Sequence, residues 1–124
     1  MRTAAQRAGD DAEARVALGL ESLGWHVLAR QVRVGRSEID LLAIDPGPPR
    51  QLVVVEVRWR SRRDYGLAEE TVDGRKRARL HRAGLVLRDA GCLPDGTPLP
   101  ALPMRFDLVV VEPGGRVRHH HFGA

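Results

Sequence analysis

Two neighbouring apolar segments, residues 37–44 and 52–60, constrain the fold of this chain more than any other feature. Both are rich in Val, Ile and Leu, and such residues favour extended strands. The residues between them include prolines and a glycine, which typically form a bend because proline cannot donate to a strand ladder. The sequence therefore predicts a β-hairpin.

Acidic residues lie at matching ends of the two predicted strands. Side chains alternate across a strand with period two, so the predicted shared faces comprise Glu38, Asp40, Leu42 and Ile44 in one strand and Leu52, Val54, Glu56, Arg58 and Arg60 in the other. If these faces coincide, Asp40 and Glu56 come close together. Two neighbouring carboxylates repel each other unless a cation lies between them. We therefore expect a divalent metal there.

The composition is that of a small globular protein. At 124 residues the chain is long enough for one hydrophobic core, and we expect a single domain over residues 1–124. No apolar run approaches the ~20 residues that a membrane-spanning helix needs, and the N-terminus lacks the apolar core of a signal peptide. Cys92 is the only cysteine, which excludes an internal disulfide. We expect a cytoplasmic protein with no membrane partner.

The balance of charge is positive. A formal net charge of +4 at pH 7 makes polyanions such as nucleic acids candidate partners. Nearly all of the cations are arginines, which the base composition of the genome would also explain. Lys76 is the only lysine in the chain. Charge alone therefore favours nucleic-acid binding without establishing it.

The first predicted helix carries a carboxylate on its apolar side. Thr3 and Gln6 have the spacing of a capping box, and Gly24 ends the helix. Its apolar stripe consists of Ala5, Ala8, Ala12, Val16, Ala17, Leu20 and Leu23. At about 100° per residue, Glu13 falls within this stripe. A carboxylate in that position needs a partner, and two candidates stay open: a buried arginine and a metal ion.

The remaining segments complete an α/β order. Residues 25–34 predict a strand, residues 74–90 a helix capped by Asp73, and residues 104–112 a further strand. The proline-rich residues 91–103 read as a connector, and residues 116–124 as a tail that can add an edge strand. The predicted order is therefore helix, three strands, helix, strand.

Basic side chains follow the second strand of the hairpin. Arg62 and Arg63 lie in a polar loop after Arg60, close in sequence to the carboxylates. Such a loop is either simply solvated or holds phosphates beside the metal, and the sequence does not decide between these. Arg75 and Lys76 begin the second helix, where Lys76 lies on the apolar side and can extend its amine around the helix start.

Residues 119–121 are three consecutive histidines. Consecutive residues of a strand cannot all face one ion, so we do not expect a physiological metal site there. The sequence also contains no Gly-rich phosphate loop, Ser-His-Asp set or zinc-finger spacing.

Five short motifs run over nearly the whole chain: Gly9-x-x-x-Glu13-x-x-x-Ala17, Ser37-Glu38-Ile39-Asp40-Leu41, Val55-Glu56-Val57-Arg58, Arg75-Lys76 and Arg105-Phe106-Asp107. Together they resemble the YraN family, a widespread bacterial family of uncharacterised proteins. That family has the restriction-endonuclease-like PD-(D/E)xK fold and is similar to archaeal Holliday-junction resolvases. The resemblance implies an α/β protein with an αβββαβ core, in which helices flank a mixed sheet.

The resemblance also implies a metal site and a partner. Glu13, Asp40 and Glu56 would be ligands of Mg²⁺ or Mn²⁺, or would support the ligands. Arg58 would occupy the position of the motif lysine. The partner would be DNA, including branched or junction DNA. The nucleic-acid contacts that we expect are those of Arg58, Arg60, Arg62, Arg63, Arg75 and Lys76.

Two residues depart from the family pattern. Ser37 replaces the glycine of the usual Gly-Glu-Ile-Asp, which alters the turn but spares the acids. Arg58 replaces the motif lysine, and a guanidinium holds phosphate but stays protonated and cannot act as a base. Either the site binds metal and DNA while cutting slowly or not at all, or Lys76 brings its amine from the second helix. From the sequence we favour the first of these interpretations.

The sequence leaves three functions open. The acids are typical of a Mg²⁺- or Mn²⁺-dependent nuclease, because such an ion activates water and neutralises charge on the phosphate. Catalysis would involve Glu13, Asp40, Glu56, Arg58 and Lys76. The alternatives are a non-catalytic nucleic-acid-binding module and a protein-interaction scaffold on a nuclease fold. The oligomeric state is open, with a homodimer as one option.

Overall fold

The computed structural model describes residues 2–59 and 74–121. In chain order its elements are α1 (Ala4–Ser22), β1 (His26–Val34), β2 (Ser37–Asp45), β3 (Gln51–Trp59), α2 (Gly74–Ala90), β4 (Met104–Val111) and β5 (Val117–His121). This order confirms the predicted αβββαβ core. The C-terminal tail adds β5 at the edge of the sheet, as expected.

The strands form one mixed sheet in the order β1-β2-β3-β4-β5. Strands β1, β2 and β3 are an antiparallel meander, and the bend of the predicted hairpin follows Asp45, whose Oδ1 accepts from the Gly47 backbone N–H (2.9 Å). Strand β4 runs parallel to β3 because the chain crosses over through α2 between them. Strand β5 pairs antiparallel with β4.

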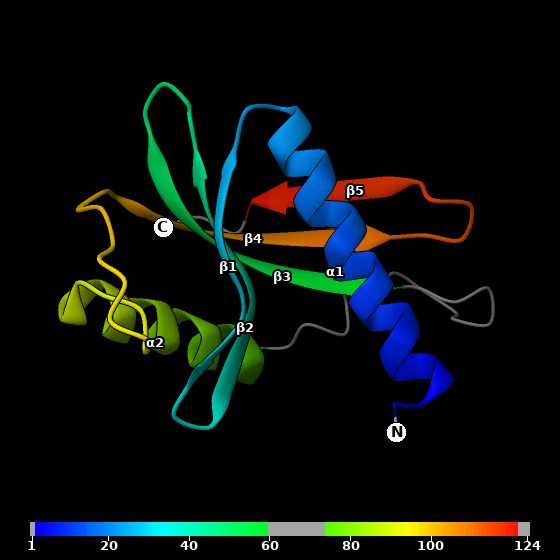
Figure 1. The fold of residues 1–124 in the computed structure, drawn as a ribbon, viewed down its shortest axis with the longest axis horizontal. Helices are drawn as coiled ribbons and strands as arrows, with labels where there is room; N and C mark the ends of the chain where they lie inside the picture. The colour runs from blue at the N-terminus through cyan, green and yellow to red at the C-terminus, as the bar shows by residue number, and fades with distance from the viewer. Residues whose placement is uncertain (1, 60–73, 122–124) are drawn as a thin grey trace.

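The two helices cover opposite faces of the sheet, and α1 crosses the strands obliquely (Figure 1). The residues that pack on the α1 side include Val16, Ala17, Leu20, Leu41, Val53 and Val55. Those that pack on the α2 side include Leu42, Ile44, Leu52, Val54, Ala83 and Leu87. Alternate residues of β3 thus enter different cores, so this central strand is buried on both faces.

Helix α1 begins and ends where its sequence predicts. Thr3 and Gln6 form a capping box, in which the Gln6 N–H donates to the Thr3 Oγ1 (3.1 Å). Gly24 adopts a positive φ of 89° after the last turn, a conformation that glycine reaches without strain. The buried stripe extends from Ala12 to Leu20 and includes Glu13. Ala5 and Leu23 were wrongly assigned to it, since Ala5 is exposed and Leu23, at the C-cap, is 72% exposed.

Helix α2 lies close to the sheet because of Gly84. A Cβ at this position would lie 2.9 Å from the Met104 sulfur and 3.1 Å from Val54 Cγ2, so only glycine permits this approach without rearrangement. The predicted capping residue Asp73 lies outside the described residues. Neither helix of the described part is long and apolar enough to span a membrane.

Strands β2 and β3 separate at Asp40. Their ladder ends with Leu41 opposite Val55, and toward its N-terminus β2 continues with β1 alone. Ile39, in this two-stranded part, packs in the α2-side core, whereas Leu41, which still pairs with β3, packs in the α1-side core. The strict alternation predicted for β2 is therefore wrong at Asp40, since a ribbon of two strands twists more strongly than a full sheet. A fork opens between β2 and β3 at this residue.

Candidate active site

Asp40 lies at the fork and contacts β3. The Val57 backbone N–H donates to Asp40 Oδ2 (2.8 Å). Leu42 pairs with Val54, and continuing this register by two residues brings Asp40 opposite Glu56. The two carboxyl groups are hydrogen-bonded to each other. The structure therefore brings together the two acids of the predicted hairpin.

The electrostatic environment of Asp40 disfavours its charge. Burial raises the pKa of Asp40 to about 8, and the negative charge of Glu56 and the hydrogen bond to it add to the rise. The Val57 N–H lowers this pKa, and the charge of Glu13 raises it further. Asp40 thus holds a proton near neutral pH, at a position where a cation would replace that proton favourably.

Two cationic side chains contact the same oxygen of Glu56. Glu56 is only 6% exposed. The Lys76 Nζ lies 2.6 Å from Glu56 Oε1, and the Arg58 Nε lies 3.5 Å from it. Lys76 comes from the first turn of α2, whereas Arg58 follows Glu56 on β3. This geometry favours the interpretation in which Lys76 supplies the amine, rather than the one that we favoured from the sequence.

Glu13 approaches the fork from α1. It is 9% exposed, and its Oε1 is buried without a hydrogen-bond partner within the described chain. Burial raises the pKa of Glu13, and the charge of Arg30 and the side chain of Gln31 oppose that rise. Arg30 is itself exposed, so the buried arginine partner that one interpretation required is not found in residues 2–59 and 74–121. Glu13 is a buried acid with an unpaired oxygen.

Gln31 is a residue of this region that no sequence pattern indicated. It is the only described non-glycine residue with a positive φ, at 52°. Such a conformation is uncommon outside glycine and, among other residues, is enriched for Asn, Asp and His, so a glutamine gives no local signal for it. Its side chain interacts with Glu13 and donates to Asp10 Oδ1 (3.3 Å). The unusual backbone therefore lies beside the candidate site.

The predicted nucleic-acid contacts are only partly described. Arg58 is partly exposed and its Nε forms no hydrogen bond within the described chain. Arg75 is exposed at the start of α2. The predicted contacts Arg60, Arg62 and Arg63 lie outside the described residues.

The donor set at the fork suits a hard divalent cation. Glu13, Asp40 and Glu56 offer carboxylate oxygens, which are the ligands that Mg²⁺ and Mn²⁺ prefer. The unpaired Glu13 Oε1 and the raised pKa of Asp40 both indicate negative charge that lacks compensation. The three carboxylates do not lie mutually within 4.8 Å, unlike Asp107, His119 and His121, which are the sole such set in the described part of the chain. Asp40 and Glu56 are therefore the pair at the fork whose carboxylates fit one such ion, and Glu13 stands beside this pair as a supporting acid.

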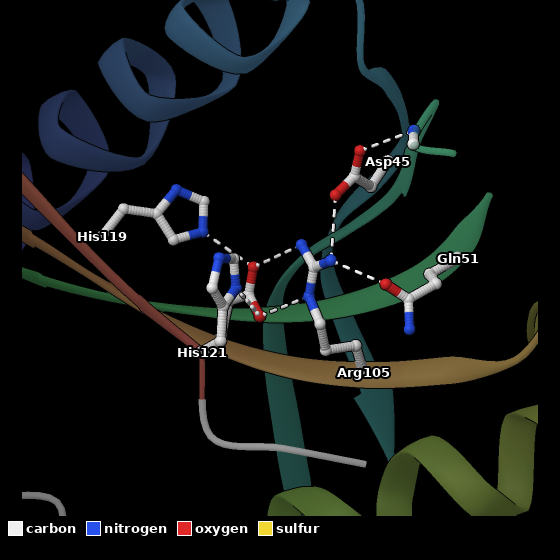
Figure 2. A network of polar contacts seen from close by, with 7 residues as sticks. Asp45, Gln51, Arg105, His119 and His121 are labelled. Carbon is white, nitrogen blue, oxygen red and sulfur yellow. Dashed lines mark hydrogen bonds and ion pairs between the residues drawn. The ribbon is translucent and has the colours of Figure 1, made fainter. Parts of the chain in front are cut away.

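A second polar network surrounds the buried Asp107 on β4 (Figure 2). Arg105 donates to both carboxylate oxygens of Asp107, at 2.9 Å each, and also pairs with Asp45 Oδ2 (2.9 Å). His119 Nε2 lies 2.7 Å from Asp107 Oδ2, and His121 Nδ1 lies 3.0 Å from Oδ1. Burial opposes the charge of Asp107, but hydrogen bonds from His119, Arg105 and His121 outweigh it and lower its pKa to about 2.

Asp107 received no role from the sequence alone. One sequence signal could have found it: Arg105 and Asp107 are polar residues two positions apart in an otherwise apolar strand, so they share a face. His119 and His121 share a face of β5 in the same way, although three consecutive histidines cannot. The network belongs to the α1 side of the sheet, because Asp107 pairs with Val55.

Comparison with known proteins identifies relatives over most of the chain. The family model described as uncharacterised protein family UPF0102 matches residues 12–111. A UPF0102 protein from Symbiobacterium thermophilum is 42% identical over 116 residues, covering 91% of this chain and 90% of the relative. One from Deinococcus radiodurans is 40% identical over 104 residues, covering 84% and 79%. Among solved structures, Pyrococcus furiosus SfsA in complex with Ca²⁺ aligns at 17% identity with a TM-score of 0.33, covering 96% of this chain and 64% of that chain.

Proposed function

The chain belongs to the uncharacterised protein family UPF0102, the YraN family, and we propose that it is a metal-dependent nuclease acting on structured DNA. The reaction would be hydrolysis of a phosphodiester bond at the fork between β2 and β3. The observation that carries this proposal is the position of the single lysine, whose Nζ lies 2.6 Å from the buried Glu56. The paired acids would hold a catalytic ion, and the amine would stabilise negative charge that develops on the phosphate.

Each side chain at the fork has a distinct part in this proposal. Asp40 and Glu56 would hold the ion, because they are the close pair of carboxylates. Glu13 would complete or support that set through its unpaired Oε1. A bound Mg²⁺ or Mn²⁺ would supply a water of lowered pKa and would neutralise charge on the phosphate.

The cations at Glu56 would act on the substrate. Lys76 is held against Glu56 and is partly exposed, so its positive charge would stabilise the charge that develops on a phosphate oxygen. The Arg58 side chain is 30% exposed, and its guanidinium would bind phosphate as a fixed cation. In the resembled family a lysine stands at the position of Arg58. We propose that Lys76, from α2, supplies the amine of that lysine here.

Structured DNA is proposed as the substrate on the basis of charge and resemblance. The net charge of +4 and the arginines near the fork favour a polyanion. An ion held by the acids at the fork would act on any phosphodiester, so the positions of these acids do not distinguish one DNA structure from another. The choice of branched DNA follows the similarity to junction resolvases.

A cleavage assay tests this proposal. Labelled flaps, four-way junctions, duplexes and single strands are incubated with the protein and Mn²⁺, and the products are separated on gels. We expect cleavage of at least one branched substrate, abolished by Asp40→Asn and by chelation of the metal. Arg79→Met on the exposed side of α2 is the matched control and should cleave as the wild type does. Absence of cleavage of every substrate, with the ion bound at Asp40, would reject the nuclease.

The second candidate is a DNA-binding module without catalysis. Arg58 favours it, because a guanidinium at the position of the motif lysine holds phosphate but does not accept a proton. Under this alternative, binding falls steeply with salt and Asp40→Asn binds as tightly as the wild type, but no product appears. Absence of binding to any nucleic acid at low salt would remove both candidates.

A further inference from the structure

We propose that Asp107, His119 and His121 form a second metal site, separate from the fork, that takes a divalent transition metal such as Zn²⁺. This site goes beyond the proposed nuclease function and does not depend on it. It lies between β4 and the edge strand β5, on the α1 side of the sheet.

Strand geometry brings the three ligands together. Asp107 pairs with His121 in the β4–β5 ladder, and His119 is two residues from His121 on the same face of β5. One ligand atom from each of the three side chains lies within 4.8 Å of the other two. His120, between them, points to the opposite face by the alternation of the strand. The site therefore uses His-x-His, rather than three consecutive histidines.

The distances are close to those of a tetrahedral zinc site. Zn²⁺ binds His nitrogen and carboxylate oxygen at about 2.0–2.2 Å, which separates neighbouring ligand atoms by about 3.3 Å. His119 Nε2 lies 2.7 Å from Asp107 Oδ2, and His121 Nδ1 lies 3.0 Å from the other oxygen, Oδ1; both are hydrogen-bond lengths, somewhat shorter than that separation. Rotations that move the two exposed imidazoles outward by a few tenths of an ångström open the space for an ion.

Arg105 holds the carboxylate of Asp107 in a fixed orientation, as an outer partner of a metal ligand does. A metal ligand must be deprotonated, and the guanidinium of Arg105 is the counter-cation of the Asp107 carboxylate. Arg105 occupies one hydrogen-bonding position on each carboxylate oxygen, which leaves the other for a histidine or a metal. A ligating carboxylate is typically oriented by such an outer partner. Arg105 is in turn fixed by Asp45 and Gln51 (Figure 2).

The chemistry of the set selects the metal. Imidazole nitrogens suit Zn²⁺, Cu²⁺ or Ni²⁺, whereas Mg²⁺ prefers oxygen ligands alone. Three protein ligands leave a fourth tetrahedral position for water. The Asp107 side chain is fully buried, and those of His119 and His121 are 27% and 57% exposed, so an ion can enter from the solvent side of β5. The two proposed sites therefore prefer different ions.

Metal titration tests this site. Protein freed of any purification tag is stripped of metal, and Zn²⁺ or Co²⁺ is titrated in; calorimetry gives the affinity, and the visible absorption of Co²⁺ reports nitrogen ligands in a tetrahedral geometry. We expect one tight ion per chain and an increase in Tm on binding. His119→Gln and His121→Gln should each weaken binding about tenfold or more, the scale on which even outer-sphere changes act. His120→Gln is the matched control and should bind as the wild type does.

Several results would overturn the proposal. If the wild type binds no Zn²⁺, Asp107 and the two histidines are only a hydrogen-bonded network. If His120→Gln weakens binding as much as His121→Gln, the histidine run binds metal without the built geometry. Asp40→Asn separates the two sites: it should leave the tetrahedral Co²⁺ spectrum unchanged, and loss of that spectrum would place the ion at the fork instead.

Discussion

The amine of Lys76, in the first turn of α2, lies 2.6 Å from Oε1 of Glu56, a buried acid in the middle of the sheet. Helix α2 packs on the face opposite to α1, the helix that carries Glu13. The fork between β2 and β3 is therefore reached by charged groups from both faces. That arrangement brings an amine from α2 to Glu56, beside the guanidinium of Arg58 from the same strand as Glu56.

Replacing Lys76 tests that relationship. Lys76→Met keeps an apolar side chain of similar length and removes the amine. We expect the rate of cleavage to fall about 10²-fold or more, since positioned acid–base groups and charge stabilisation each contribute on that scale. Initial rates on the cleaved substrate provide the measurement, and circular dichroism checks that the fold is retained.

A second substitution in that variant distinguishes chemistry from folding. The Arg58 Nε lies 3.5 Å from the same Glu56 oxygen, so Arg58→Lys places a new amine close to the lost one. The double variant Lys76→Met, Arg58→Lys should recover about tenfold of the rate. A rate for Lys76→Met equal to that of the wild type would contradict the assigned role of Lys76.

Glu13 should matter for function and not for folding. Glu13→Gln replaces a buried carboxylate whose pKa is raised mainly by burial, so stability should stay the same or rise. Cleavage should fall about 10²-fold, because one acid of the metal site is lost. Asp11→Asn, an exposed position of the same helix, is the control. Equal rates for the two variants would show that Glu13 serves packing alone.

The pH dependence of stability tests the environment of Asp40. Its pKa is raised in the folded protein from 3.8 to about 8. At a pH between these two pKa values, Asp40 is protonated in the folded protein and deprotonated in the unfolded chain. The free energy of unfolding of the metal-free protein should therefore fall as pH rises. Asp40→Asn should remove this part of the slope and raise stability at pH 8 by about 0.5–2 kcal/mol. Urea titrations at several pH values measure both, and a slope unchanged in Asp40→Asn would refute the assignment.

Asp107 should be important for stability. Asp107→Asn keeps the shape but removes the charge that Arg105 neutralises in a fully buried position, so we expect a loss of about 3–5 kcal/mol. The control is Glu38→Gln, which disrupts the exposed ion pair of Glu38 with Arg33 (3.7 Å) and should change stability by less than about 1 kcal/mol. Comparable losses in the two variants would contradict the importance of burial.

Local patterns predicted most of the fold. The capping box at Thr3, the alternation of β3 and the bend after Asp45 depend on residues close in sequence, and the structure has each of them. Even the approach of Asp40 to Glu56 followed from the hairpin register.

Features that depend on distant pairing could not be predicted in this way. The change of face at Asp40 requires knowing that β2 leaves β3 there. The position of the Lys76 amine requires knowing how closely α2 packs, which Gly84 decides through contacts with β3 and β4. The cluster at Asp107 depends on pairing between β4 and β5, and periodicity within one strand does not reveal its neighbour.

The central claim is that the fork binds a divalent ion, and anomalous scattering from crystals soaked in Mn²⁺ tests it most directly. We predict a peak in contact with the carboxylates of Asp40 and Glu56, absent from crystals of Asp40→Asn. A saturated crystal with no peak at the fork, or with a peak only at Asp107 and its histidines, would contradict the claim.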